Sequence, residues 1–370
     1  MEEKFELNGE DREQESATFR EASRRSDAIW ADLPRHPAKY RVLTGDRPTG
    51  PLHVGHLFGT LANRVRIQDL GATVFILIAD YQVLTDRDTA ENVGENAHEV
   101  ILDYLACGLD PENGRTFFFS HSHVPELNQL LLPFMNLVTT AELDRNPTVK
   151  DEIKAAGLRQ VNALMYTYPI HQAADILAVK GNVVPVGRDQ LPHLELTRKI
   201  ARRFDDRFAP GHPVFPIPDA LLSDLPMVLG TDGQKMSKSR NNAILLKMSA
   251  AETARLIKGA KTDADRHIAY DPANRPEVAN LLRLVGICTG AAPEAVAERI
   301  GDGGGGKLKG ELTEALNAHL APMRERRARF AKDPAYVLDV LRRGVARARE
   351  EAIATLKEVR KAMNMDHGLD

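Results

Sequence analysis

The stretch from Gly45 to His56 constrains the fold more than any other part of the sequence. It is a turn rich in glycine and proline that joins a short predicted strand at 40–43 to residues 57–70, where apolar side chains recur at helical spacing. A strand, a turn and a helix in this order are typical of open α/β sheets, which bind ligands at the carboxyl ends of their strands. The stretch therefore predicts a ligand site at this turn.

The residues of the turn suit a phosphate ligand. We expect the helix to begin near Pro51 or Leu52, because proline is favoured in a first turn whose N–H groups lack partners. His53 and His56 would then lie on one face of that turn, where the helix dipole and free N–H groups attract phosphate. Gly55 between them leaves room for a flat base. Taken alone, two histidines near a helix start are more often caps or core groups.

A second motif changes this interpretation. The run Lys235-Met236-Ser237-Lys238-Ser239 lies much further along the chain, in a polar segment between Gly230 and Asn242. By itself the run is typical of a solvated basic loop. Together with His53-Val54-Gly55-His56 it resembles the two signatures of the class I aminoacyl-tRNA synthetases, of the HIGH and KMSKS type, in pattern, order and separation. The resemblance implies an enzyme that activates an amino acid with ATP and transfers it to tRNA.

Alternating strand and helix patterns predict the fold around the two motifs. The expected elements are strands at 73–79, 116–120, 183–186 and 227–229, and helices at 89–107, 125–138 and 190–204. This order predicts a Rossmann-like, doubly wound parallel sheet in a catalytic domain at 38–247. A helical insertion is expected at about 138–180, and the KMSKS loop at 230–243.

The two flanking regions differ from this pattern. Residues 1–37 are rich in charges and poor in apolar groups, which predicts an extension outside the core, with Trp30 anchoring its end. From residue 248 onward only helices are expected, at 249–258, 276–288, 292–300, 308–332 and 334–363, with a turn at the glycine run 303–306.

The last helices carry an excess of positive charge. Residues 324–361 hold twelve Lys and Arg against six Asp and Glu, a net charge of +6, whereas the whole chain has a net charge of −3. A solvated helix face would explain such an excess, and so would contact with a polyanion. We therefore expect 248–370 to be a helical domain that binds tRNA.

The two cysteines and the hydropathy of the chain indicate in which cellular compartment the protein is expected. Cys107 and Cys288 lie in apolar helical contexts, which predicts buried free thiols in a reducing compartment. No apolar run approaches membrane-spanning length, and we expect no signal peptide. A cytoplasmic protein with no membrane partner is expected.

Amino-acid activation expels pyrophosphate from ATP and needs donors where negative charge builds up. The expected catalytic groups lie on the turn and on the mobile loop: Thr49, His53 and His56, and Lys235 and Lys238. The hydroxyl groups of Ser237 and Ser239 would add donors. Mg²⁺ would accompany ATP and be held mainly by its phosphates, so no dedicated metal site is expected.

A second polar cluster predicts the amino-acid pocket. Gln172 and Asp175 share one face of a helix that contains Tyr168 to Leu177. A carboxylate buried among Ala, Ile and Leu needs a donor, which a substrate N–H or O–H could supply; backbone or water could also satisfy it. Residues 186–190 follow the next strand and face the same end of the sheet.

The resemblance narrows to the tryptophanyl-tRNA synthetases. It rests on Val184 to Gln190 with the helix after it, and on 173–177, 262–263, 270–271 and 280–282, and it extends from about Arg41 to Met363. It implies that Asp175 accepts the indole N–H of L-tryptophan, with Gln82, Gln172 and Gln190 in the same pocket. It implies ATP contacts from Arg47, Pro48, Thr49, Gly55, His56, Gly187, Arg188, Asp189, Met227, Lys235, Met236, Ser237, Lys238 and Ser239. It also implies a homodimer, with tRNA(Trp) lying across both subunits.

Three residues depart from the usual bacterial pattern and keep alternatives open. Arg47, Gln82 and Gln172 stand where Gln, His and Met are common, as in the second, auxiliary tryptophanyl enzymes of some bacteria. Because Gln172 and Asp175 also resemble a tyrosyl-type pocket, tyrosine is the alternative substrate. A nucleotidyltransferase is disfavoured by the long basic helical region, and a synthetase-like RNA-binding or regulatory protein by the two intact motifs.

Overall fold

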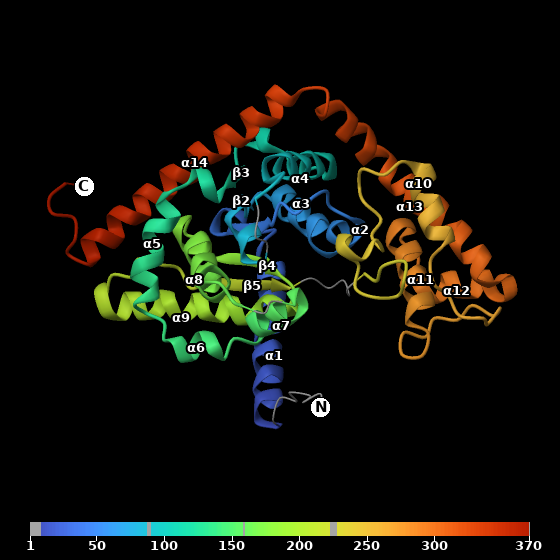
Figure 1. Cartoon of the computed structure of the whole chain (residues 1–370), viewed down its shortest axis with the longest axis horizontal. Helices are drawn as coiled ribbons and strands as arrows, with labels where there is room; N and C mark the ends of the chain where they lie inside the picture. Colours follow the sequence, from blue (N-terminus) through green and yellow to red (C-terminus); the bar gives the residue numbers. More distant parts are fainter. Residues whose placement is uncertain (1–8, 87–89, 158–159, 223–227, 370) are drawn as a thin grey trace.

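The computed structural model describes residues 9–86, 90–157, 160–222 and 228–369. A parallel sheet lies at its centre, with strand order β3-β2-β1-β4-β5 (Figure 1). The strands are β1 (Arg41–Asp46), β2 (Thr73–Ile78), β3 (Thr116–Ser120), β4 (Val183–Val186) and β5 (Asp219–Leu222). The order runs outward in both directions from β1 and β4, so the switch point lies between these two strands. The predicted Rossmann-like fold class is confirmed.

Helices cover both faces of the sheet because alternate residues of each strand point to opposite sides. Val74 and Ile76 of β2 lie in the core that contains α3 (Ala62–Asp69) and α4 (Val93–Cys107). Phe75 and Leu77 lie in the core on the other side. That side contains α5 (Glu126–Met135), α8 (Ala163–Ala178) and α9 (Leu191–Phe208). The near-continuous apolar run predicted as a strand is buried on both faces, as expected.

Smaller elements join these layers. The helices between α5 and α8 are α6 (Thr140–Asp144) and α7 (Pro147–Ala156), in the predicted insertion. The short 3₁₀ helices are Pro37–Lys39, Tyr81–Thr85, Pro111–Asn113, His121–His123, Arg188–Gln190, Lys238–Arg240 and Gly301–Gly303. In the part of the chain that the structure describes, no helix is both long and apolar enough to cross a membrane.

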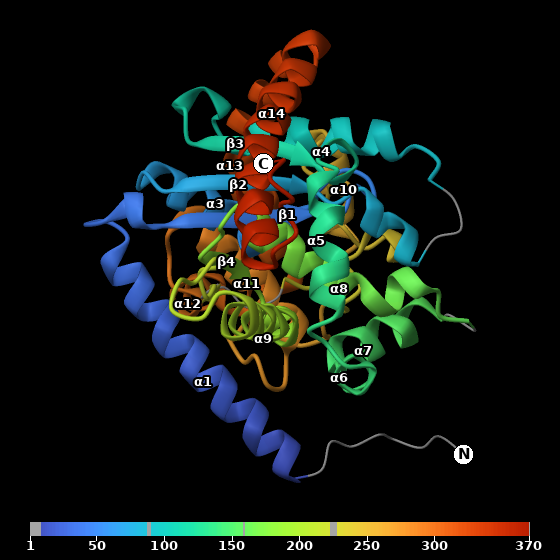
Figure 2. The ribbon, with the colours of Figure 1, turned by 90° about the vertical axis from the view of Figure 1, so that its left-hand side faces the viewer.

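The described part of the region before residue 37 is helical and contributes buried residues to the core, contrary to the expectation of an extension outside it. Residues Gly9–Asp32 form α1, which runs past the sheet and packs against β5 (Figure 2). Ala22 and Ile29 of this helix are buried, and the Ser26 hydroxyl accepts a hydrogen bond from the Leu222 backbone N–H at 2.9 Å. Trp30 packs against the core as expected, with the Arg66 guanidinium 4.3 Å from its ring centre.

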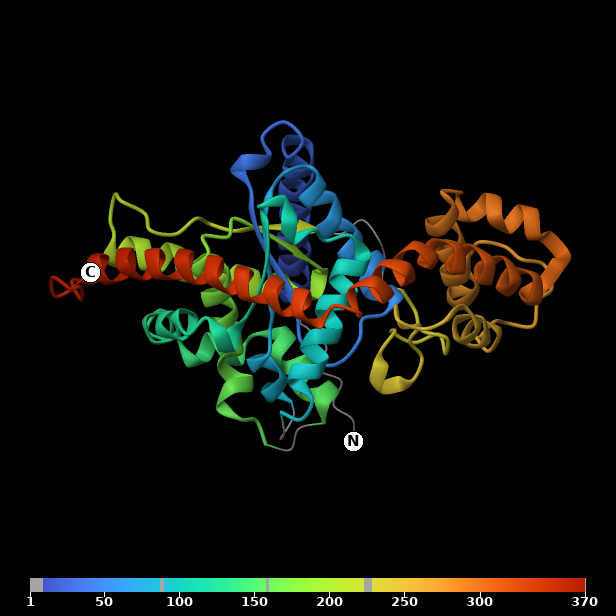
Figure 3. The same cartoon turned by 90° about the horizontal axis from the view of Figure 1, so that it is seen from above.

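The region after residue 248 also does more than form a separate domain. Helices α10 (Ala250–Lys258), α11 (Pro276–Thr289), α12 (Pro293–Ile300) and α13 (Gly304–Phe330) extend beside the sheet, and we call them the helical group (Figure 3). The last helix, α14 (Pro334–Ala362), instead crosses the edge strand β3. Val340 joins the core on one side of the sheet and Leu356 the core on the other. Helices thus cover both edge strands, β3 by α14 and β5 by α1.

Two further predictions were wrong in detail. The fifth strand is β5 at Asp219–Leu222, whereas Leu229, in the predicted strand 227–229, makes only an isolated antiparallel bridge with Lys235. A four-residue strand gives too few alternations for its pattern to be detected. The predicted turn at 303–306 overlaps the helix that begins at Gly304, and the left-handed backbone lies at Gly301 and Gly304.

The crossing of α14 over β3 yields a prediction about stability. A Cβ at Gly344 would overlap the carbonyl oxygen of Phe118 and lie 2.6 Å from its backbone nitrogen, and a strand backbone cannot move aside cheaply. Gly344→Ala should therefore lower the free energy of unfolding, measured by urea denaturation, by about 1–3 kcal/mol. Gly310→Ala on α13, where a Cβ meets no atom within 4 Å, should raise it by about 0.5–1 kcal/mol. Equal effects of the two substitutions would contradict this packing.

Candidate active site

The signature turn, residues 47–56, leaves the carboxyl end of β1 and closes as a helix cap. The helix α2 (Val54–His56) begins later than Pro51 or Leu52, with His53 as its N-cap. It continues into a π-helical turn at Leu57–Leu61 and then into α3. The His53 backbone N–H donates to Nδ1 of His56 at 3.2 Å, and the two ring centres lie 3.8 Å apart. The two histidines are therefore neighbours, as expected. They meet because His53 caps the helix that ends its first turn at His56, and not because both lie on one helical face.

Backbone hydrogen bonds attach this turn to the segment that follows the second signature. The Val54 N–H donates to the Ile244 carbonyl at 3.0 Å, and the Leu246 N–H donates to the Leu52 carbonyl at 2.9 Å. The Leu52 N–H donates to a carboxylate oxygen of Asp103 on α4 at 2.7 Å. The two motifs, distant in the sequence, are thus joined at the level of the main chain.

Both signature histidines are neutral at neutral pH. Burial, the neighbouring His56 and the Lys238 ammonium lower the pKa of His53 to about 3. Burial also lowers the pKa of His56 to about 4, although the carboxylate of Asp46 opposes this, and Lys238 again adds to the lowering. The rings can therefore donate or accept hydrogen bonds at the turn, but they do not bring positive charge to it.

A buried ion pair lies behind the histidines. Asp46, at the end of β1, accepts hydrogen bonds from Nη1 of Arg64 and from the Tyr104 hydroxyl, each at 2.6 Å. Burial favours the neutral acid, but the charges and hydrogen bonds of Arg64 outweigh it, so the pKa of Asp46 is lowered. This carboxylate was not identified from the sequence, although it immediately precedes the signature turn.

The KMSKS loop lies closed on the signature turn. Nζ of Lys238 donates to Oγ1 of Thr49 at 3.1 Å and to the Gly50 carbonyl at 2.9 Å. Met236 is buried, and a Cβ at Gly55 would lie 3.6 Å from its sulfur. The exposed Lys235 is close enough for its charge to lower the pKa of His56. The structure therefore brings most of the predicted ATP-binding residues of the two motifs together.

Asn242 and the helical group hold this loop in shape. The Asn242 side chain accepts a hydrogen bond from the Ser237 N–H and donates to Asp232, both at 2.7 Å. At the base of the loop the Leu229 N–H donates to Oδ1 of Asn280 on α11 at 2.9 Å. Two predicted positions cannot be placed: Met227 and the side chain of Ser239 lie outside the described residues.

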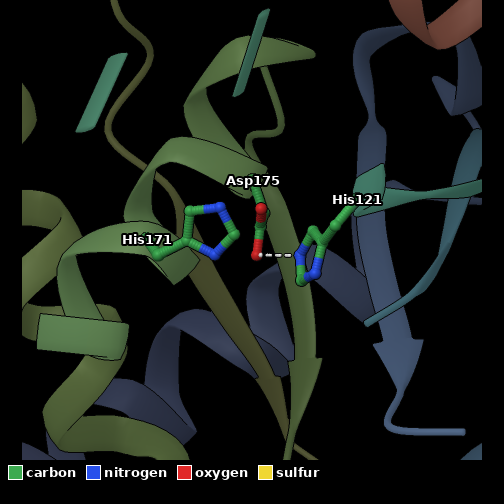
Figure 4. Close-up of side chains that lie close together, drawn as sticks. All are labelled: His121, His171 and Asp175. Carbon is green, nitrogen blue, oxygen red and sulfur yellow. Dashed lines mark ion pairs between the residues drawn. The ribbon is translucent and has the colours of Figure 1, made fainter. Parts of the chain in front are cut away.

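Asp175 lies in a buried cluster with two histidines that the sequence analysis did not single out (Figure 4). Its side chain is 1% exposed, and Oδ2 lies 3.0 Å from Nε2 of His121. The His121 and His171 ring centres are 4.6 Å apart. The carboxylate oxygens have no hydrogen-bond partner among the described residues, because the close His121 contact lacks hydrogen-bond geometry. They are available to a ligand's donor.

Polar side chains lie close to both rings, and one of them hydrogen-bonds His171. Nε2 of His171 lies 3.1 Å from Oδ1 of Asn128, and Nδ1 of His121 lies 3.8 Å from Oδ1 of Asp80. Burial lowers the pKa of His171, so its ring is neutral. His121 follows the carboxyl end of β3, the ligand end of the sheet, which was the signal that could have identified it. The side chain paired with Asp175 is therefore His121, and not Gln172, which is half-buried on the same helix.

The same three residues could hold a metal ion. His121, His171 and Asp175 offer ligand atoms that all lie within 4.8 Å of one another. An ion bound there would occupy the carboxylate that a substrate donor needs. Because Asp175 is also the residue expected to accept the indole N–H, the cluster coincides with the candidate amino-acid pocket.

The remaining predicted residues lie on segments that follow the strands β1, β2 and β4. Gly187, Arg188 and Asp189 are exposed at the end of β4, and Gln190 beside them donates to Asp189 at 3.3 Å. The Arg188 guanidinium lies 4.8 Å from the ring centre of Phe19, on α1. The other three lie in the two segments that follow β1 and β2. Arg47 forms an ion pair with Asp86, Pro48 is buried and Gln82 is half-buried.

The positive charge of the last helices is largely used within the protein. Arg327 forms an ion pair with Asp103 on α4, Arg343 with Glu112 on the 3₁₀ helix Pro111–Asn113, and Arg349 with Glu126 on α5. The charge excess at 324–361 therefore attaches α13 and α14 to the sheet. Because the charge is used in this way, the excess does not by itself indicate a contact with tRNA. The sequence analysis could not identify these ion pairs, since the acidic partners lie far from the arginines in the chain.

Known proteins match this chain over most of its length. The matching family model is described as tRNA synthetases class I (W and Y), and it covers residues 36–321. A tryptophan–tRNA ligase of Treponema pallidum is 41% identical over 346 residues, which cover 88% of this chain and 97% of that protein. The tryptophan–tRNA ligase of Thermotoga maritima is 39% identical over 335 residues, covering 88% and 99%.

Solved structures agree with these sequence matches. A tryptophanyl-tRNA synthetase from Campylobacter jejuni, complexed with ADP and tryptophan, has a TM-score of 0.75 at 28% identity and covers 88% of this chain and 99% of its own. A tyrosyl-tRNA synthetase from Archaeoglobus fulgidus, at 22% identity and a TM-score of 0.60, shares the fold and covers 78% of this chain.

The neutral histidines predict an acid-sensitive fold. The pKa of His56 is about 4 in the folded protein and ordinarily 6.5, so the unfolded chain binds the proton more tightly. The stability due to the neutral ring is fully present above pH 6.5 and is lost as the pH falls toward 4, by about 1.4 kcal/mol per pH unit. In His56→Asn this contribution is absent, so between pH 6.5 and pH 4 the free energy of unfolding should fall less steeply than in the wild type, by about 1.4 kcal/mol per pH unit. Urea denaturation from pH 8 to pH 4.5 measures both slopes, and parallel slopes would contradict the assignment.

Proposed function

The chain belongs to the class I tRNA synthetases for tryptophan and tyrosine, and from this premise we propose that it activates L-tryptophan with ATP and transfers it to tRNA(Trp). The first step forms tryptophanyl-adenylate and releases pyrophosphate; the second forms tryptophanyl-tRNA and releases AMP. The observation that carries the proposal is the contact of Lys238 with Thr49 and Gly50, which brings both signatures to one site.

In the first step a carboxylate oxygen of tryptophan attacks the α-phosphorus of ATP, and the bond to pyrophosphate breaks. Negative charge grows on the leaving pyrophosphate, and the ammonium groups of Lys235 and Lys238 would neutralise it. His53 and His56, which are neutral, would donate hydrogen bonds to phosphate oxygens. Mg²⁺ would accompany ATP, held mainly by the phosphates, and add positive charge there.

Tryptophan selection would rest on Asp175. Its oxygens lack a hydrogen-bond partner among the described residues, and apolar groups such as Ala174 and Ile176 surround it. The indole N–H would satisfy this acceptor, and a ligand without a donor would leave the buried carboxylate without a hydrogen bond. The tyrosine hydroxyl is also a donor, so tyrosine remains the second candidate substrate. The names of the curated relatives favour tryptophan.

The family resemblance also supports finer proposals. We propose that the protein is a cytoplasmic homodimer and that tRNA lies across both subunits, contacting the helical group. The two cysteines, Cys107 and Cys288, are free, which suits a reducing compartment. Measurement of the native mass by light scattering would test the dimer directly, and a mass near 40.9 kDa would contradict it.

The main test is exchange of pyrophosphate into ATP, measured with tryptophan, tyrosine and phenylalanine. Exchange should depend on tryptophan. Preference for tyrosine would overturn the substrate assignment, exchange without any amino acid would favour a nucleotidyltransferase, and no exchange would favour a regulatory protein. Asp175→Asn should lower tryptophan-dependent exchange steeply, because charge-assisted hydrogen bonds are about twice as strong as neutral ones. Asp206→Asn, on the exposed side of α9, is the control.

The loop lysines give a second prediction. Lys235→Ala and Lys238→Ala should each lower kcat for exchange by about 10²–10³, because the lost charge meets a group that becomes more anionic in the transition state. KM for tryptophan should change little. Lys332→Ala, an exposed lysine after α13, should behave as wild type. Wild-type exchange rates in both loop variants would remove the loop from the mechanism.

A further inference from the structure

Asp103, on α4, is a buried carboxylate for which the proposed reaction has no direct use. Its side chain is fully buried, and its two oxygens serve different segments. Oδ2 accepts the Leu52 backbone N–H at 2.7 Å, in the signature turn next to His53. Oδ1 accepts Nε of Arg327, on α13, at 2.7 Å. One carboxylate therefore connects the turn to a C-terminal helix.

Glu99, one helical turn earlier on α4, extends this connection. Its Oε2 accepts Nη2 of Arg327 at 3.0 Å and Nζ of Lys247 at 2.9 Å. Lys247 directly follows the 244–246 segment that is hydrogen-bonded to the signature turn. The signature turn, the segment after the KMSKS loop and α13 thus meet on one face of α4.

We propose that Asp103 and Arg327 are positioning residues for amino-acid activation, and that they couple the position of α13 to that of the signature turn. The inference rests on the proposed function. A buried carboxylate needs its cation, so Asp103 holds Leu52 firmly only while Arg327 is in place. Because α13 also packs against α10 and α11, and α11 binds the base of the KMSKS loop, movement of the helical group reaches both signatures.

Electrostatics make this coupling measurable. Burial raises the pKa of Asp103, as does the nearby charge of Glu99, while the Arg327 guanidinium and the Leu52 N–H lower it. Two other titratable groups lie nearby. Lys247 donates a hydrogen bond to Glu99. The Cys107 thiol remains neutral, because burial and the charge of Asp103 raise its pKa. Removing the guanidinium should therefore move the titration of Asp103 to higher pH. The protonated acid would hold the Leu52 N–H less tightly than the charged carboxylate does.

The test uses the full chain in tryptophan-dependent pyrophosphate exchange, from pH 6 to pH 9. Arg327→Gln should lower kcat by about ten- to a hundredfold, since a small misplacement of reacting groups costs this much, with KM for tryptophan nearly unchanged. The acid limb of its kcat profile should move to higher pH, and activity should partly recover in alkali. Asp103→Asn should lack that limb.

The double variant and a neighbouring arginine complete the design. Arg327→Gln combined with Asp103→Asn should be no slower than Asp103→Asn alone, because the pair acts as one unit. Arg326→Gln is the matched control: this arginine donates to the Ala106 carbonyl on the same helix α4, so its loss should leave kcat and the pH profile unchanged.

Several results would overturn the proposal. A wild-type kcat or a wild-type acid limb in Arg327→Gln would do so, and so would strictly additive effects in the double variant. If Arg327→Gln does not fold, Arg327→Lys keeps the charge and should keep the wild-type acid limb with a lower kcat; a shifted limb in this variant would also count against the proposal. Absence of exchange in the wild type would instead refute the proposed function.

Discussion

Two backbone hydrogen bonds between the signature turn and the segment 244–246 hold the site together. They join Val54 to Ile244 and Leu246 to Leu52, and so fix where the KMSKS loop ends relative to the helix that carries His53 and His56. The base of the loop is fixed at Leu229 by Asn280. Because both ends of the loop are held, only a short segment has to be ordered for Lys238 to contact Thr49 and Gly50.

The charges of the site are divided between buried groups and the KMSKS loop. The histidines of the turn are buried and neutral, and the ion pair of Asp46 with Arg64 behind them is internally compensated. In the proposed reaction the positive charge for the anionic phosphates would come from Lys235 and Lys238 on the KMSKS loop, and Lys238 already contacts the signature turn. The buried histidines and the compensated Asp46–Arg64 pair carry little electrostatic cost in the absence of ligand. Asp175 differs, because its buried oxygens lack a hydrogen-bond partner among the described residues and a donor would stabilise them.

The sequence predicted those features whose signal is local. The run at 73–79 is continuous and apolar because both faces of β2 are buried, and the two signatures are contiguous in the chain. Features that depend on distant partners were missed. The segment around Ala22 and Ile29 is charged because only a few residues of each turn of α1 are buried there. His121 could be recognised as a site residue only from its position beside Asp175. The excess charge at 324–361 was interpreted as a surface for a polyanion because Asp103, Glu112 and Glu126 lie on other elements.

The placement of α14 has a consequence for how the chain is made on the ribosome. All five strands precede α14 in the sequence, so the sheet can assemble before the helix that crosses β3 at Gly344 has been translated. During that interval the edge at Phe118 is open to pairing with other chains. The edge at β5 differs, because α1 precedes every strand and is already available when β5 emerges. Protection of the nascent sheet is therefore needed on one side only, and it ends when α14 docks.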